Sequence, residues 1–313
     1  MLLIVWGMLL SSHANAAPET CLNCHTGLTP IQVQEWKTSG HAKSLETLKA
    51  SPDATDKCLV CHSSDYRSDP ANITLANAEL GNTCTTCHKK HDAEFRFPGV
   101  NQELLKPKKE LCNDCHTVGS AKPGEVPRAA QVEIFNGRGG IDVPDSPGVH
   151  SIIMPDGCVT CHTFKADPKV ASDVGGHTFK ANVAKCTDCH GNNAAQKKAD
   201  ANKQIADLLT KVNPLLDAYA NKNSDDFKNA KFNVELVKIS GDGGVHNLKY
   251  SKTLLENSIS VLEGGGGPPP VAEESCLLCH RGLTPAIVTQ WESSAHAMSL
   301  KTLKESPDAK DDC

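Results

Sequence analysis

The sequence predicts a mainly α-helical chain with extensive loops, little β-structure and an interior that side chains alone do not fill. Aromatic residues make up only 4% of the 313 residues and hydrophobic residues 39%, whereas there are 15 cysteines and 14 histidines. Short segments with helical spacing alternate with loops rich in Pro, Gly and Asp, and few segments alternate with the two-residue period of a strand. We therefore expect a non-protein group to supply much of the core.

The N-terminal residues predict an exported chain. The apolar run at residues 2–10 is too short to cross a bilayer, and Ala14, Asn15 and Ala16 match the small-residue pattern of a cleavage site. We expect residues 1–16 to be a signal peptide and the rest to be periplasmic or extracellular, with no membrane span. The net charge is −5, and the sequence contains no stripe of basic residues. Both observations argue against a nucleic-acid partner.

A long internal repeat organises the sequence. Residues 21–58, CLNCHTGLTPIQVQEWKTSGHAKSLETLKASPDATDKC, align without a gap with residues 276–313, CLLCHRGLTPAIVTQWESSAHAMSLKTLKESPDAKDDC. Because Cys58 opens the segment CLVCH, Cys313 should open the same motif, and we expect the sequence to be a fragment of a longer tandem-repeat protein. The alternative for Cys313 is an unpaired thiol that forms an intermolecular disulfide.

The repeat sets the expected domain boundaries. We expect one domain over residues 17–263, a linker over 264–274 that begins GGGGPPP, and the truncated start of a second repeat over 275–313.

Fourteen of the fifteen cysteines form seven copies of one motif, Cys-x-x-Cys-His. The copies are Cys21/Cys24/His25, Cys58/Cys61/His62, Cys84/Cys87/His88, Cys112/Cys115/His116, Cys158/Cys161/His162, Cys186/Cys189/His190 and Cys276/Cys279/His280. This is the attachment signature of haem c: the two thiols form thioethers with the haem vinyl groups, and the adjacent imidazole is the proximal iron ligand. Zinc knuckles, a redox dithiol and a disulfide framework are the alternatives, but none requires a histidine after every second cysteine.

We therefore expect seven complete haem c sites, with an eighth truncated at Cys313. The large apolar faces of the haems would supply the hydrophobic stabilisation that the thin side-chain core lacks.

Most of the remaining histidines are candidates for the distal iron ligand. They are His41, His91, His150, His177, His246 and His296. His91 follows His88 by only three residues, a segment too short to reach the opposite face of the same haem, so we expect it to serve a neighbouring haem.

The first repeat contains six motifs but only five such histidines. One iron is therefore open, binds Met154 or Lys43, or takes a histidine from another repeat. A simple core methionine is the other reading of Met154.

The sequence also predicts individual helices. Residues 195–222 are expected to form a helix interrupted near Pro214, and residues 247–263 another, with His246 at its start. His41 is expected on an amphipathic helix whose Trp36, Leu45 and Leu48 share one face, with Trp36 in a packing role.

These segments resemble a known superfamily. WKTSGHA at 36–42, CTTCHKKHDAEF at 84–95, GGHTF before CTDCHG, and GVHNLKY at 244–250 are similar to segments of the octahaem hydroxylamine oxidoreductases, related octahaem reductases and pentahaem ammonia-forming cytochrome c nitrite reductases. The resemblance implies distal-ligand roles for His177 and His246.

The chain departs from that superfamily in three respects. The position after Asn247 is Leu248 in place of the usual Pro, and the Cys-x-x-Cys-Lys motif of the nitrite reductases is missing. Hydroxylamine oxidoreductases cross-link a tyrosine to the catalytic haem, but nothing marks Tyr66, Tyr219 or Tyr250 for that role.

The sequence is compatible with three functions. We favour an electron carrier that exchanges electrons with a donor and an acceptor protein through closely spaced, mostly bis-histidine haems. The alternatives are an oxidoreductase acting on a small nitrogen or sulfur compound such as nitrite or hydroxylamine at one open haem, and a filament-forming subunit that self-associates through its repeats.

Overall fold

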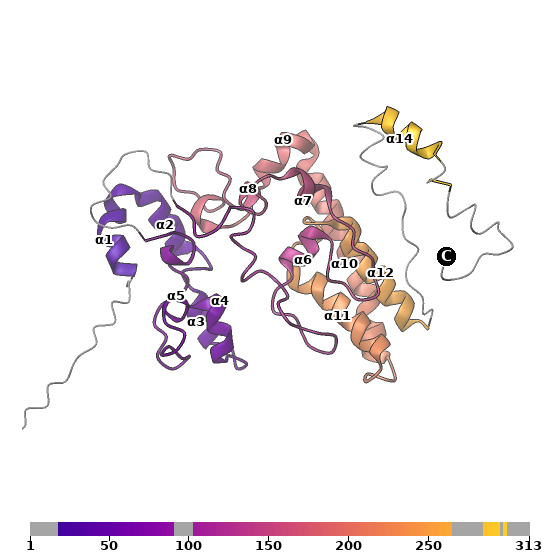
Figure 1. Cartoon of the computed structure of the whole chain (residues 1–313), viewed down its shortest axis with the longest axis horizontal. Coiled ribbons are helices and arrows are strands. Elements are labelled where there is room, and N and C mark those ends of the chain that lie inside the picture. Colours follow the sequence, from indigo (N-terminus) through magenta and orange to yellow (C-terminus); the bar gives the residue numbers. More distant parts are fainter. Residues whose placement is uncertain (1–17, 91–102, 265–283, 295–296, 299–313) are drawn as a thin grey trace, which may run out of the picture.

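The computed structural model describes residues 18–90, 103–264, 284–294 and 297–298. This part of the chain is helical, as predicted: its only β-pairing is an isolated bridge between His88 and Leu104. Figure 1 shows α1 to α5 on the left and α6 with α10 to α12 to their right, with α8 between the two groups and α7 and α9 above α6. No helix in the described ranges has the length and apolar character needed to cross a bilayer.

Short helices and helical turns make up the first two thirds of the described chain. They are α1 (Pro18–Leu28), α2 (Pro30–Thr38), α3 (Ser44–Lys49), η1 (Asp56–Cys58), α4 (Leu59–His62), α5 (Ser64–Ser68), η2 (Cys84–Thr86), α6 (Gln131–Asn136), α7 (Val149–Ile153), α8 (Val159–His162), η3 (Gly176–Thr178), η4 (Val183–Cys186), α9 (Thr187–His190) and η5 (Gly191–Asn193). Most are too short to be stable alone, so packing against other parts of the molecule must hold them.

Three long helices form the main apolar core. They are α10 (Ala194–Ala218), α11 (Asp225–Ser240) and α12 (Leu248–Leu262). Val212, Leu236 and Leu254 come one from each helix and have no exposed surface. The sequence analysis did not identify α11, which begins at the Ser224 cap and ends at Gly241 in the left-handed conformation.

Helix α10 runs continuously through Pro214, so the predicted interruption at that residue is wrong. The helix also ends at Ala218, four residues before the expected end. Val212 and Leu216, on either side of the proline, are buried in the core formed with α11 and α12. This packing offsets the backbone hydrogen bond that proline cannot make.

His41 does not lie on one amphipathic helix, as the sequence analysis expected. It lies in the turn between α2 and α3, where the backbone N–H of Ser39 donates to the Trp36 carbonyl at 2.9 Å. The indole of Trp36 has the expected structural role, because its Nε1 donates to the Asn82 carbonyl at 2.9 Å. The turn carries the His41 imidazole toward a cavity described below.

Most of the expected linker and second repeat lies outside the described residues. This includes Cys276, Cys279, His280, His296 and Cys313. Of the second repeat the structure describes α14 (Pro285–Glu292), which falls at the positions aligned with α2 and also begins at a proline.

Candidate haem-binding site

Each described Cys-x-x-Cys-His motif adopts one helical turn. The backbone N–H of the histidine donates to the carbonyl of the first cysteine, at 2.8 Å for His88, 3.0 Å for His116 and 3.0 Å for His162. On such a turn, positions i, i+3 and i+4 face the same side. Both thiols and the imidazole of a motif therefore project into the same space, as haem c attachment requires.

All six described motifs line one connected cavity of about 4610 Å³. A pocket for a single small ligand usually measures about 300–1,000 Å³. The cavity also reaches the four described candidate distal ligands: His41, His150, His177 and His246. Its size, and the repeated thiols and imidazoles on its walls, fit several large cofactors held side by side.

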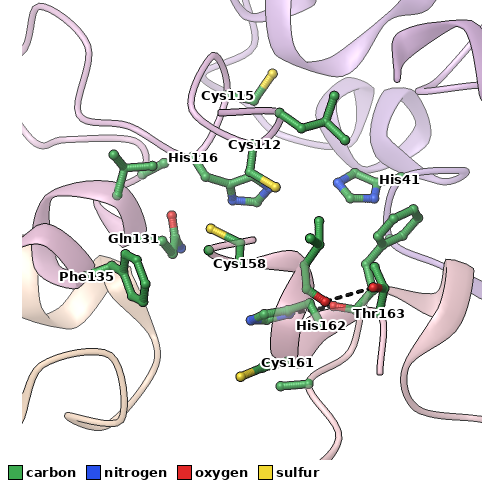
Figure 2. A pocket seen from close by; sticks show the side chains of 18 of the residues that line it. His41, Cys112, Cys115, His116, Gln131, Phe135, Cys158, Cys161, His162 and Thr163 are labelled. Carbon is green, nitrogen blue, oxygen red and sulfur yellow. Dashed lines mark hydrogen bonds between the residues drawn. The ribbon is translucent and has the colours of Figure 1, made fainter. Parts of the chain in front are cut away.

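Within this cavity, four motif histidines each face one of these four histidines. The ring centroids are separated by 6.1 Å for His116 and His41, 6.2 Å for His88 and His177, 6.1 Å for His190 and His150, and 6.3 Å for His162 and His246. Figure 2 shows the first pair, with the Cys112 and Cys158 thiols nearby.

The separation matches two imidazoles bound to opposite sides of one metal ion. Imidazole nitrogen binds a metal such as zinc at about 2.0–2.1 Å, so two ligands in line place their ring centroids roughly 6.4 Å apart. The four measured separations agree with this value although the partners are far apart in sequence. The arrangement fits four bis-histidine haem sites.

Burial favours the neutral form that a histidine ligand needs. Burial, together with the nearby His116, lowers the pKa of His41 to about 4. Burial also lowers the pKa values of His88, His177 and His246. Neutral imidazole is the form that binds metal, so these four rings are ready for ligation near neutral pH.

The second ring nitrogen of several histidines is fixed by a backbone carbonyl. Nδ1 of His162 donates to the Phe179 carbonyl at 2.8 Å, and Nδ1 of His150 to the Val245 carbonyl at 3.1 Å. Such a bond selects the tautomer whose Nε2 is free to bind metal. His246 instead has a carboxylate beside its Nδ1, at 3.2 Å from Asp242 Oδ2.

Contacts between thiols show which attachment motifs are neighbours. Cys21 contacts Cys84, linking the first and third motifs. Cys112 contacts Cys158, linking the fourth and fifth.

The fifth and sixth motifs are linked by the approach of Cys161 to Cys186. The second motif lies beside the fourth through Cys61 and Cys115, and Cys87 of the third motif is also near Cys115. The sites therefore form a row in the order first, third, fourth, fifth and sixth, with the second as a branch at the fourth.

The remaining predicted ligands are placed as follows. Among the described residues, no histidine ring faces His62, whose Nδ1 donates to the Ser44 carbonyl at 3.0 Å. His91 lies outside the described residues. Met154 is half-buried and lines the cavity, whereas Lys43 is exposed and does not line it.

None of the three tyrosines lines the cavity. Tyr250 is buried in α12, where its hydroxyl accepts a hydrogen bond from the Gly140 N–H at 2.7 Å. Tyr219 stacks on Phe227, with ring centroids 5.6 Å apart. Tyr66 packs against the small apolar cluster around Leu59.

Three residues that shape the site were not predicted from the sequence: Glu35, Phe179 and Asp242. Phe179 lies within the GGHTF segment and Asp242 four residues before His246, so their neighbourhood was visible. No sequence signal marks Glu35 as buried, because the aligned residue of the second repeat is Gln290.

Comparisons with known proteins agree with this arrangement. The family of cytochrome c7 and related cytochromes c matches residues 40–117, which contain three of the motifs. A probable nitrite reductase–hydroxylamine oxidoreductase fusion protein of Kuenenia stuttgartiensis is 33% identical over 98 residues, covering 25% of this chain and 11% of that protein.

Two solved structures are similar in fold. The outer cell wall cytochrome OcwA has a TM-score of 0.64 and 31% identity, covering 74% of this chain and 50% of OcwA. The undecahaem cytochrome from the S-layer of Carboxydothermus ferrireducens has a TM-score of 0.55 and 22% identity, covering 74% of this chain and 41% of that one. The chain thus spans half or less of the length of each of these three proteins. Its helical fold, its Cys-x-x-Cys-His turns and these likenesses together make the chain a multihaem c-type cytochrome.

Proposed function

We propose that this chain is an exported electron carrier whose described part holds six haem c groups in a branched row. The observation that carries the proposal is the four facing histidine pairs at 6.1–6.3 Å. A haem iron held by two imidazoles would have no position left for a substrate. Such sites suit transfer of electrons better than transformation of a bound molecule.

The residues of the chain divide this work. The paired cysteines would hold each haem covalently, and the facing histidines would supply the ligands to its iron. Haem c, when bound, supplies reversible one-electron redox chemistry at its iron. Burial of the histidine pairs and the hydrogen bonds at their Nδ1 atoms hold the ligands in one orientation, so little rearrangement accompanies a change of charge.

The order of the thiol contacts supports a continuous path. Neighbouring motifs contact one another at Cys21 and Cys84 and at Cys112 and Cys158, and they approach one another at Cys87 and Cys115 and at Cys161 and Cys186. The branch ends at the Cys58 site. Donor and acceptor proteins would meet the chain at the ends of this row. We place the six sites in a domain over residues 17–263, with haem attached also at Cys276 and Cys279, and we place His91 and His296 as distal ligands.

The location follows from the N-terminal segment and from the similar proteins. A signal peptide over residues 1–16 would export the chain, and the two similar solved structures are named as outer cell wall and S-layer proteins. We therefore propose a periplasmic or extracellular location. Self-association through the repeats would extend the row from one copy to the next.

A second function, oxidoreductase activity on a small anion such as nitrite, would reside at the Cys58 site. His62 is not part of the four described pairs, and we choose this site because of the cationic side chains beside it. Two cationic side chains lie beside it: the guanidinium of Arg128 donates to Cys58 Sγ, and that of Arg67 to Cys115 Sγ at 3.5 Å. Arg67 is also ion-paired with Asp114 at 3.5 Å, so Arg128 is the side chain whose positive charge would attract an anion.

Carbon monoxide binding to the reduced, haem-loaded chain tests the proposal, because carbon monoxide needs a vacant axial position. His41→Ala, His150→Ala, His177→Ala and His246→Ala should each add one carbon monoxide site and convert one low-spin electron paramagnetic resonance signal to high spin. Binding by the unaltered chain at most of its haems would contradict the bis-histidine sites. Rapid turnover of nitrite or hydroxylamine, lost in Arg128→Gln, would favour the oxidoreductase.

A further inference from the structure

One loop between the fifth and sixth motifs reaches three neighbouring sites. We define it as the 164–180 loop. It closes on itself, because the Gly175 N–H donates to the Lys180 carbonyl at 2.8 Å. Near its end, the Gly176 N–H donates to the carbonyl of Thr163, the residue that follows the fifth motif, at 3.1 Å.

The loop contributes a different group to each of the three sites. His177 faces His88 of the third motif at 6.2 Å. The Phe179 carbonyl accepts the hydrogen bond from His162 Nδ1 in the fifth motif. The Phe179 ring packs edge-on against His41, which faces His116 of the fourth motif, with centroids 4.6 Å apart.

Phe179 adopts a backbone conformation that its side chain disfavours. Its φ of 58° lies in the left-handed region, which is uncommon for a bulky residue. Such a conformation persists only where the surroundings fix it. The position of the loop must therefore be set by a strong anchor outside it.

The anchor is the carboxylate of Glu35, which projects from α2. Its side chain is 1% exposed and forms an ion pair with Lys165, whose side chain is 9% exposed. Oε1 also accepts from the Ser172 N–H at 3.2 Å, and Oε2 from the His177 N–H at 3.0 Å. Three points of the loop thus bind one buried carboxylate.

Gly176 allows this close approach. A Cβ at this residue would lie 2.1 Å from Glu35 Oε2, and its φ of +53° also favours glycine. The contact between the carboxylate and the loop therefore depends on both residues.

We propose that Glu35 is a positioning residue that holds the 164–180 loop, and through it the axial imidazoles of the third, fourth and fifth sites. The inference rests on the proposed haem ligation by His177. Glu35 touches no motif residue itself, and it acts through the backbone of His177 and the placement of Phe179. A glutamine at this position would keep only one acceptor oxygen, so it could accept from the His177 N–H or from the Ser172 N–H but not from both.

The test compares Glu35→Ala, Glu35→Gln and Gly176→Ala in the haem-loaded 313-residue chain, with His177→Ala as the reference. We expect Glu35→Ala and Gly176→Ala to gain one carbon monoxide site on reduction, with loss of the same low-spin signal that His177→Ala loses. Glu35→Gln should restore part of that signal, because its single amide oxygen can still accept from the His177 N–H although the second acceptor and the ion pair with Lys165 are lost. Glu46→Gln, an exposed change on α3, is the matched control and should alter nothing.

The outcomes separate the two proposals. If His177→Ala leaves the spectrum unchanged, the proposed ligation fails. If His177→Ala loses a signal while Glu35→Ala and Gly176→Ala keep it and only lower the melting temperature, Glu35 is structural and the inference is overturned. Addition of imidazole should refill the vacated position in Glu35→Ala, and failure of this rescue would also count against it.

Discussion

The buried carboxylate of Asp242 is hydrogen-bonded to the short segment that leads to His246. Its side chain is 5% exposed and accepts hydrogen bonds from the hydroxyl of Ser240 and the backbone N–H of Gly244 and His246. The remaining approach, 3.2 Å to His246 Nδ1, places negative charge beside a proposed iron ligand. Negative charge at this position stabilises the oxidised metal and makes the ligand more basic.

Asp242→Asn should therefore raise one reduction potential by an amount on the order of tens of millivolts. The measurement is a spectroelectrochemical titration of the haem-loaded chain, with His246→Ala to identify the affected site. Asp226→Asn, an exposed change on α11, should leave every potential unchanged. An unchanged titration in Asp242→Asn would show that its charge is compensated by the surrounding donors.

Asp65 gives the structure a predictable dependence on pH. Burial alone would raise its pKa, but hydrogen bonds from the Glu79, Leu80 and Tyr66 N–H groups and the Ser63 hydroxyl lower it below the usual value. The unfolded pKa is about 3.9, so the stabilisation is complete above that pH and is lost as pH falls through the lower folded value.

Asp65→Asn should cost about 1–3 kcal/mol at neutral pH, because it weakens several bonds to a charged acceptor. The difference from the unaltered chain should shrink as pH falls below about 4. Thermal unfolding followed by circular dichroism measures both effects. Asp53→Asn, which is exposed, serves as the control, and a penalty independent of pH would contradict the charge-based explanation.

At the scale of the elements, α10 carries a strained position. Pro214 lies inside the helix, where a proline removes one backbone hydrogen bond and costs about 3 kcal/mol. Pro214→Ala should stabilise the chain by about 1–3 kcal/mol, the gain being reduced by greater freedom of the unfolded chain. Pro285→Ala, at the first turn of α14 where proline is tolerated, should have little effect on chemical unfolding. Loss of stability in Pro214→Ala would mean that the proline ring contributes essential packing.

These elements also show how much of the structure can be predicted from the sequence. The helical class and the individual motif turns were predictable, because each turn depends on five consecutive residues. The course of α10 through Pro214 was not, because it depends on packing of Val212 and Leu216 against distant helices. The turn holding His41 was missed for the same reason: Trp36 donates to Asn82, which lies far along the chain.

Prediction of the histidine pairs from the sequence has the same limit. The sequence identified all four described candidates for the second ligand, but it contains no rule that joins His41 to His116 or His150 to His190. Each pair closes over a long stretch of chain whose path is set by loops and by buried groups such as Glu35. The number of ligands is therefore a property of the composition, whereas their pairing is a property of the fold.

For the whole molecule, buried apolar residues are distributed unevenly. The cluster that includes α6 and α10 to α12 has sixteen buried members, and the cluster around Leu59 has four. The N-terminal part must therefore depend on bound haem for much of its stability, whereas the three long helices have a core of their own.

A chain prepared without haem should keep protease-resistant fragments close to residues 130–143 and 194–262, which share the apolar cluster, while residues 18–90 and 149–190 are cut rapidly. Limited proteolysis with mass spectrometry measures this, and the haem-loaded chain provides the control, which should resist cleavage in both parts. Equal resistance of the two parts in the haem-free chain would show that the cavity walls fold without their cofactors.

The thiol contacts between neighbouring motifs constrain the timing of maturation. Hydrogen bonding between Cys61 and Cys115 lowers the pKa of Cys115 to about 7, and the contact with Cys112 does the same for Cys158. A thiolate beside a second thiol forms a disulfide readily in an oxidising compartment. A chain that reached this shape before receiving haem would thus be cross-linked between motifs, Cys61 to Cys115 and Cys112 to Cys158. Peptide mapping should find these two links in any haem-free chain that becomes compact, and three attachment sites would then stay closed to haem until a reductant opened them. Covalent attachment of haem must therefore precede the final folding of the chain.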